Sequence, residues 1–309
     1  MRLYKKAAAV LLAAAMAVSM MTACGGGAGG GPGVVEGVTY TSNAGLVAGV
    51  DENSITNQTS IPMNKSRYAA FMEMTSNPKN PKLYVKLSIA NVDNGVLADA
   101  TDLEVAQTEK YIYQKASYDG QTMEELVEKA TNGVYEYTFV DASGRKAAVR
   151  LFQKVNSPET PDVPDTSGTP SAQAMISSAQ VTVNGNPYYA EIIKSGGTEV
   201  VVCYEADKPV PTYEFQTNRS GGKSVAVYNT ICFGTDKGTI AQRLSGYTVY
   251  TATVDEDSRT KGTLKNETTN VTYDVEATGN TYTVKKDGAP TDEINWLIDG
   301  ILKELNKKS

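Results

Sequence analysis

Thiol chemistry in this sequence of 309 residues is limited to three cysteines, Cys24, Cys203 and Cys232. Histidine is absent from the whole chain. This excludes Ser-His-Asp and Cys-His hydrolase sites and most zinc sites, because they need an imidazole as base or ligand. The sequence also contains no phosphate-binding glycine motif. We therefore expect no cofactor, no metal and no enzyme of these classes.

Cys24 follows a segment with the order of a secretory signal. Arg2, Lys5 and Lys6 give a basic start, residues 7–18 are apolar, and small residues precede the cysteine. The apolar run is shorter than the roughly 20 residues that a bilayer-spanning helix needs. We expect residues 1–23 to be a signal peptide that is removed.

The residues Met21-Thr22-Ala23-Cys24 resemble the lipobox of bacterial lipoproteins, with Met21 in place of the usual Leu. The resemblance implies that a diacylglyceryl group is attached to the Cys24 sulfur and that cleavage makes Cys24 the first residue. Acyl chains would then hold the protein at the extracytoplasmic face of the cell membrane. Residues 24–34 are mostly glycine and predict a flexible tether. The alternative is an ordinary cleaved signal with an incidental cysteine.

Composition and a proline-rich segment predict two folded parts. The full chain has a net charge of −6 and no basic block, which disfavours nucleic acid as a partner. Residues 156–173 (NSPETPDVPDTSGTPSAQ) contain four prolines and read as a linker. The expected fold class is mainly β, with one domain over 35–155 and a second over 174–309.

In the first part, Lys82–Ala90 alternates apolar and polar residues and predicts a strand. Thr122 and Glu125 form the pattern of a capping box, so we expect a short helix over residues 122–130. Residues 68–74 fit either a strand or a helix. Two further strands are expected at 134–140 and 146–154, joined by a turn at 141–144.

Residues 132–155 (NGVYEYTFVDASGRKAAVRLFQKV) resemble the last two strands of bacterial immunoglobulin-like domains. Tyr135 matches the tyrosine-corner position at the start of strand F. The resemblance implies an immunoglobulin-like β-sandwich over 35–155. The alternative is another α+β domain that ends in a hairpin.

The second part carries hairpin signals, since Asn184-Gly185 and Gly196-Gly197 are two-residue turns between apolar segments. Together with Gly221-Gly222 and Gly279-Asn280 they predict an antiparallel meander of seven or eight strands. Tyrosines on these strands could bind a glycan or a peptide, because tyrosine combines contact area with a polar tip. The alternative is that they are half-buried strand residues. These candidates are Tyr188, Tyr189, Tyr204, Tyr213 and Tyr228.

Cys203 and Cys232 could form a disulfide in an oxidising compartment, or they could be two buried apolar residues. An apolar stripe over residues 294–305 predicts a C-terminal helix that begins after Thr291 and closes one face of the sheet. Trp296 interrupts the polar side of this helix, either as an exposed contact or at the helix–sheet margin. Residues 254–267 superficially resemble a calcium loop, but Arg259 occupies a ligand position, so a solvated acidic loop is expected.

Three functions remain open at this point. The first is a non-enzymatic binding or adhesion module for a protein, glycan or envelope component. The second is a carrier of lipid or hydrophobic ligands, which predicts an apolar cavity between the sheet and the helix at 291–306. The third is a carboxylate-based glycan hydrolase, which predicts two carboxylates about 5–10 Å apart in a cleft.

Overall fold

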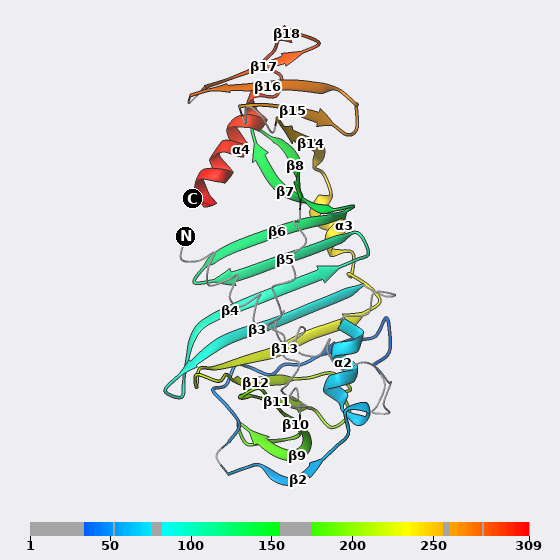
Figure 1. The fold of residues 1–309 in the computed structure, drawn as a ribbon, viewed down its shortest axis with the longest axis vertical. Coiled ribbons are helices and arrows are strands. Elements are labelled where there is room, and N and C mark those ends of the chain that lie inside the picture. Colours follow the sequence, from blue (N-terminus) through cyan, green and yellow to red (C-terminus); the bar gives the residue numbers. More distant parts are fainter. Residues whose placement is uncertain are drawn as a thin grey trace, which may run out of the picture.

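The computed structural model describes residues 34–51, 53–75, 82–154, 175–255, 260–279 and 281–308. The predicted signal peptide, Cys24, most of the tether and the linker at 156–173 lie outside the described residues. The described chain is mainly β, as the sequence predicted. Its strands form one 18-stranded sheet that runs along the length of the molecule (Figure 1).

The described residues before the linker form eight strands, one 3-10 turn and one α-helix. They are β1 (Thr39–Thr41), β2 (Thr56–Ser60), η1 (Met63–Lys65), α2 (Arg67–Thr75), β3 (Leu83–Asp93), β4 (Val96–Gln107), β5 (Tyr111–Tyr118), β6 (Gln121–Ala130), β7 (Gly133–Ala142) and β8 (Arg145–Lys154).

After the linker, the residues that the structure describes form ten strands and two α-helices. They are β9 (Met175–Val183), β10 (Asn186–Ser195), β11 (Thr198–Tyr204), β12 (Tyr213–Thr217), β13 (Lys223–Phe233), α3 (Thr239–Leu244), β14 (Thr248–Val254), β15 (Lys261–Asn266), β16 (Thr272–Thr278), β17 (Thr281–Lys286), β18 (Ala289–Pro290) and α4 (Asn295–Lys308).

Strands from the two parts of the chain are interleaved in this sheet. β3–β8 lie between β9–β13 on one side and β14–β18 on the other (Figure 1). β13 pairs antiparallel with β3 along most of its length, and β14 pairs parallel with β8. The sequence predicted separate domains over residues 35–155 and 174–309. The hydrogen bonding of the sheet does not divide the chain in this way. The prediction of one continuous second meander is also wrong, because β3–β8 divide it into two runs.

The strands β3–β8 follow one another as antiparallel neighbours. Two-residue turns such as Asn94-Gly95, Asp119-Gly120 and Ser143-Gly144 join them, and both residues of each turn have positive φ. This geometry matches the twist of the flanking strands. The structure confirms the expected hairpin of residues 134–154 but not the immunoglobulin-like sandwich, because successive strands are neighbours in one sheet.

The helix predicted over residues 122–130 is wrong, because these residues form β6. The Asp119-Gly120 turn returns the chain beside β5, and β6 then pairs with β5 on one side and β7 on the other. Leu126 and Glu128 are buried on one face, with period two. Pairing on both edges satisfies the backbone, which outweighs the local capping signal.

The helices cover the sheet in separate places. α2 forms one core with β3, β10, β11 and β13, and residues 44–50 cover the opposite face of the same strands. α3 contributes Ile240 to a core on β4–β8, and α4 packs against β7, β8 and β14–β17. The predicted C-terminal helix is confirmed, with Ile294, Leu297 and Ile298 buried.

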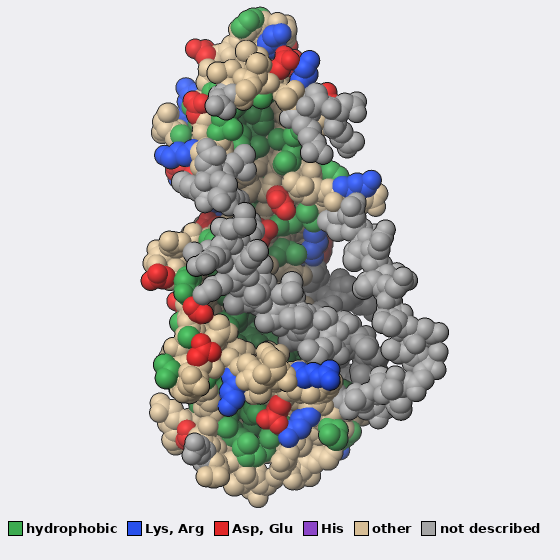
Figure 2. Space-filling view, turned by 60° about the vertical axis from the view of Figure 1, so that its left-hand side comes forward, with side chains coloured by type: hydrophobic (Ala, Val, Ile, Leu, Met, Phe, Trp, Pro, Cys, Tyr) green, Lys and Arg blue, Asp and Glu red, His purple; other side chains and the backbone are tan. Residues whose placement is uncertain are grey.

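The surface carries charges of both signs. On the face seen in Figure 2, Lys and Arg side chains are interspersed with Asp and Glu along the molecule. Among the described helices, none has the length and hydrophobicity that crossing a bilayer requires.

Candidate functional site

The tyrosines singled out from the sequence do not form one exposed surface. Tyr204 and Tyr213 are buried in different cores, on opposite faces of the sheet. Tyr189 and Tyr228 are half-buried beside the first of these cores, and Tyr188 beside the second. These rings pack against the sheet, which fits the alternative of half-buried strand residues better than that of a glycan- or peptide-binding face.

Cys203 and Cys232 are both free and buried. Cys203 lies in the core under residues 44–50, whereas Cys232 lies in the core that α3 covers. The disulfide alternative is therefore wrong, and the buried-residue alternative is confirmed. Burial raises the pKa of the Cys203 thiol to about 12. This thiol stays protonated and unreactive at neutral pH.

Trp296 is half-buried and lines an open cleft of about 490 Å³ where α4 begins. Arg145 and Lys146 from the start of β8 line it, as do Thr248 from the start of β14 and Tyr273 from β16. Because β8 and β14 run parallel, with Ala147 opposite Thr248, both strands begin at the same end of the sheet. The parallel pair thus brings residues about 100 positions apart in sequence to one cleft.

Glu293 lines the cleft, and Lys286 offsets the charge of its carboxylate. Its side chain accepts hydrogen bonds from Lys286 Nζ at 3.1 Å and from the Tyr273 hydroxyl at 2.9 Å. The hydrogen bond from Lys286, followed by that from Tyr273, holds the pKa of Glu293 below its usual value. Burial, together with the bond to Glu293, raises the pKa of Tyr273 to about 12. At neutral pH Glu293 is ionised and Tyr273 is protonated.

Of the two cationic residues that line the cleft, Arg145 is the one whose charge faces Trp296. The Arg145 guanidinium lies 5.7 Å from the centre of the Trp296 ring and donates to the Glu293 carbonyl oxygen at 3.5 Å. In the described part of the chain, it has no carboxylate partner within ion-pair distance. The Lys146 ammonium lies on the other face of the sheet, where it pairs with Asp141 at 3.6 Å and stands 5.5 Å from the centre of the Tyr247 ring. Both side chains of this pair are at least half exposed, so it contributes little to stability.

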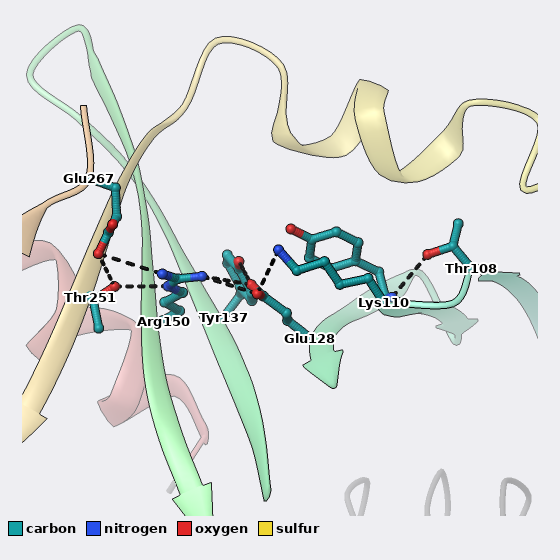
Figure 3. Close-up of polar contacts among 8 residues, drawn as sticks. Thr108, Lys110, Glu128, Tyr137, Arg150, Thr251 and Glu267 are labelled. Atoms are coloured by element: carbon teal, nitrogen blue, oxygen red, sulfur yellow. Dashed lines mark hydrogen bonds and ion pairs between the residues drawn. The ribbon is translucent and has the colours of Figure 1, made fainter. Parts of the chain in front are cut away.

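A polar network on β6, β7, β8 and β14 fixes the parallel pair (Figure 3). Arg150 Nη1 donates to Glu128 Oε2 at 2.9 Å, and Arg150 Nε donates to the Thr251 hydroxyl at 2.8 Å. Tyr137 also donates a hydrogen bond to Glu128, and Lys110 forms an ion pair with Glu128 at 3.0 Å. Arg150 therefore joins a carboxylate on β6 to the strand β14 that carries Thr248.

Glu128 remains ionised although it is buried. Burial alone would raise the pKa of its carboxyl group. The hydrogen bonds from Tyr137, Lys110 and Arg150 outweigh this effect and hold the pKa below its usual value. We interpret the network as structural support for the cleft, because its groups satisfy one another.

A second groove of about 400 Å³ lies on the opposite face of β14–β17. Each of its two lysines lies beside a carboxylate on a neighbouring strand. Lys261 pairs with Glu276 at 3.4 Å, and Lys285 lies opposite Asp274. Asp255 of the predicted acidic loop also lines this groove, whereas Asp257 and Arg259 lie outside the described residues. No group of three Cys, Asp or Glu side chains among the described residues could hold a metal ion.

The sequence singled out Trp296 but missed its neighbours Arg145, Lys146 and Tyr273. No local motif marks these residues, because the parallel β8–β14 pair alone brings them together. The site offers an aromatic ring, hydroxyl groups and charged groups in an open cleft. In comparisons with known proteins, no family model and no curated protein matches this chain.

Proposed function

We propose that this protein is a non-enzymatic, membrane-anchored lipoprotein that binds a saccharide-bearing component of the cell envelope in the Trp296 cleft. The observation that carries the proposal is the placement of a half-buried indole ring beside Thr248, Tyr273 and the Arg145 guanidinium. A sugar ring has an apolar C–H face and a rim of hydroxyls. Such a ligand suits an aromatic surface flanked by a few fixed polar groups.

The anchor in this proposal is a lipid on Cys24, and the glycine-rich residues 24–34 let the folded part stand off the membrane. A Cys24→Ala substitution tests it. We expect the variant to leave the membrane fraction, whereas a Cys203→Ala control stays there. Retention of the Cys24→Ala variant at the membrane would contradict the lipid anchor.

Two observations favour a binding module over the alternatives. The interface in which a carrier would need an apolar cavity is occupied by Ile294, Leu297 and Ile298, and Leu297 is fully buried. Among the described residues that line the Trp296 cleft, Glu293 is the only carboxylate. A glycosidase of the usual kind uses two carboxyl groups, one of them protonated at the start. Lys286 keeps Glu293 ionised instead.

The saccharide site can be tested by fluorescence, because Trp296 is the only tryptophan in the chain. We would titrate the full-length protein in detergent micelles with a panel of neutral and acidic oligosaccharides. A ligand that occupies the cleft should change the emission of Trp296, and calorimetry should give the affinity. Trp296→Leu should abolish binding, whereas Phe152→Leu, at an exposed ring on β8, should not. Unchanged calorimetric binding by Trp296→Leu would refute the site.

A further inference from the structure

The charge at the Trp296 cleft is opposite to that of the protein. The chain has a net charge of −6, yet the cleft is lined by Arg145 as well as by Glu293. Glu293 is engaged with Lys286 at 3.1 Å. The Lys146 ammonium lies 5.5 Å from the Tyr247 ring, on the other face of the sheet, so the surplus positive charge at the cleft lies on Arg145.

Arg145 is the better placed of the two cations to receive a ligand. Its side chain is exposed, and in the described residues its only hydrogen bond is a long one to the Glu293 carbonyl oxygen. The guanidinium stands 5.7 Å from the centre of the Trp296 ring. A ligand in contact with the indole ring would thus lie within reach of the guanidinium. A planar guanidinium binds carboxylate and phosphate groups through two parallel hydrogen bonds.

The carboxylate of Glu293 does not prevent an anionic group from binding to Arg145. Its two carboxylate oxygens accept hydrogen bonds from Lys286 and Tyr273, so they are turned to partners within the protein. Lys146 turns away from the cleft, since it pairs with Asp141 and its Nζ lies 5.5 Å from the Tyr247 ring. Among the described residues, the cleft therefore presents one guanidinium without a carboxylate partner beside an aromatic ring.

We infer that the cleft selects acidic saccharides, with Arg145 as the receptor for a carboxylate or phosphate group and Trp296 as the contact for the sugar ring. This inference rests on the proposed saccharide site. It extends that proposal by naming the ligand class and a specificity-determining residue. The second groove, with its Lys–Glu and Lys–Asp neighbours, should show no such preference.

The test compares matched sugars on the full-length protein in detergent micelles. One arm uses a galacturonic acid oligomer against a galactose oligomer, and the other uses mannose 6-phosphate against mannose. We expect the acidic member of at least one pair to bind at least tenfold more tightly at low salt, and the preference to shrink as salt screens the charges. The two arms distinguish a carboxylate source from a phosphate source.

Variants then assign the preference to Arg145. Arg145→Gln should remove the preference, so that the acidic and neutral sugars of a pair bind with similar affinity, whereas Arg145→Lys should retain part of it. Arg219→Gln, at an exposed arginine in the loop between β12 and β13, is the matched control and should behave as the wild type.

Each contrary outcome has a separate meaning. Equal binding of acidic and neutral sugars would overturn the charge selectivity while the saccharide site stands. No binding of any sugar in the panel would overturn both proposals. An Arg145→Gln variant that keeps the full acidic preference would refute the role of Arg145.

Discussion

Glu191 Oε1 accepts a hydrogen bond from the backbone N–H of Arg67 at 2.7 Å, across 124 residues of sequence. Its other oxygen accepts from the Tyr68 N–H at 3.0 Å and from the Ser66 hydroxyl at 2.6 Å. Glu191 is fully buried on β10, so a strand that follows the linker caps a helix that precedes it. The free N–H groups and the dipole at the start of α2 stabilise this buried charge.

Glu191→Ala should therefore detach α2 from the sheet. The substitution leaves two backbone donors and the Ser66 hydroxyl without their acceptor, which should cost about 3 kcal/mol of unfolding free energy. Urea unfolding measures the loss, and amide exchange at Arg67 and Tyr68 should accelerate. Glu199→Ala, which removes an exposed pair with Lys194, should cost less than about 1 kcal/mol. Similar losses in the two variants would contradict the capping role.

Glu128→Gln should destabilise the protein at pH 7 by about 3 kcal/mol, because it breaks a largely buried pair with Arg150. The pKa of Glu128 in the folded protein lies below the ordinary value of 4.5. The stability from its ionised form is therefore complete above pH 4.5 and is lost as the pH falls through the lower, folded-state value. At pH 7 the wild type should have a higher unfolding free energy than Glu128→Gln. This difference should narrow only below about pH 4.5.

The control for this pH dependence is Glu136→Gln, at an exposed carboxylate on β7. It should shift the urea midpoint only slightly at any pH. A Glu128→Gln difference that stays constant down to pH 2 would show that the effect does not come from the ionised carboxylate.

Gly300→Ala should destabilise the protein, although alanine is normally the better helix former by about 1 kcal/mol. A Cβ atom at residue 300 would lie 2.2 Å from Val140 Cγ1, so α4 must move away from β7. Overpacking of this kind costs about 1–3 kcal/mol. Thermal unfolding checks the loss. In the Val140→Ala background, Gly300→Ala should cost much less or become stabilising, because the clash is gone.

The two buried thiols should be unreactive in the folded protein. In a full-length Cys24→Ala variant, a disulfide reagent such as dithionitrobenzoate should label neither Cys203 nor Cys232 under native conditions, and both after denaturation. The physical reason is that both side chains are free and buried. Labelling of fewer than two thiols in the denatured, unreduced protein would reveal a disulfide.

Several local features follow from sequence alone, because they depend on neighbouring residues. Asn184-Gly185 supplies the two positive φ angles that a tight hairpin needs, so β9 and β10 pair as predicted. The apolar spacing around Leu297 predicts the buried stripe of α4. Alternation in Lys82–Ala90 predicts β3, although that strand continues to Asp93. Each signal lies within a few residues of the element it specifies.

Buried acids were harder to interpret from the sequence. Glu191 lies in the apolar run YYAEIIK. Glu128 lies within residues 122–130, whose apolar spacing also fits a helix. An acidic residue at a core position of a strand is itself a signal of a buried partner. The partners Ser66 and Arg150 lie 125 and 22 residues away, so the sequence could not identify them.

By itself, the sequence determined that the protein is mainly β, where most hairpins turn, and that a helix closes the C-terminal end. The tertiary structure decided the order of strands, since a free strand edge can pair with any strand of suitable register. By placing β3 beside β13 and β14 beside β8, it turned two predicted domains into one sheet. It also brought Arg145 beside Trp296, because only long-range pairing joins the start of β8 to the start of α4.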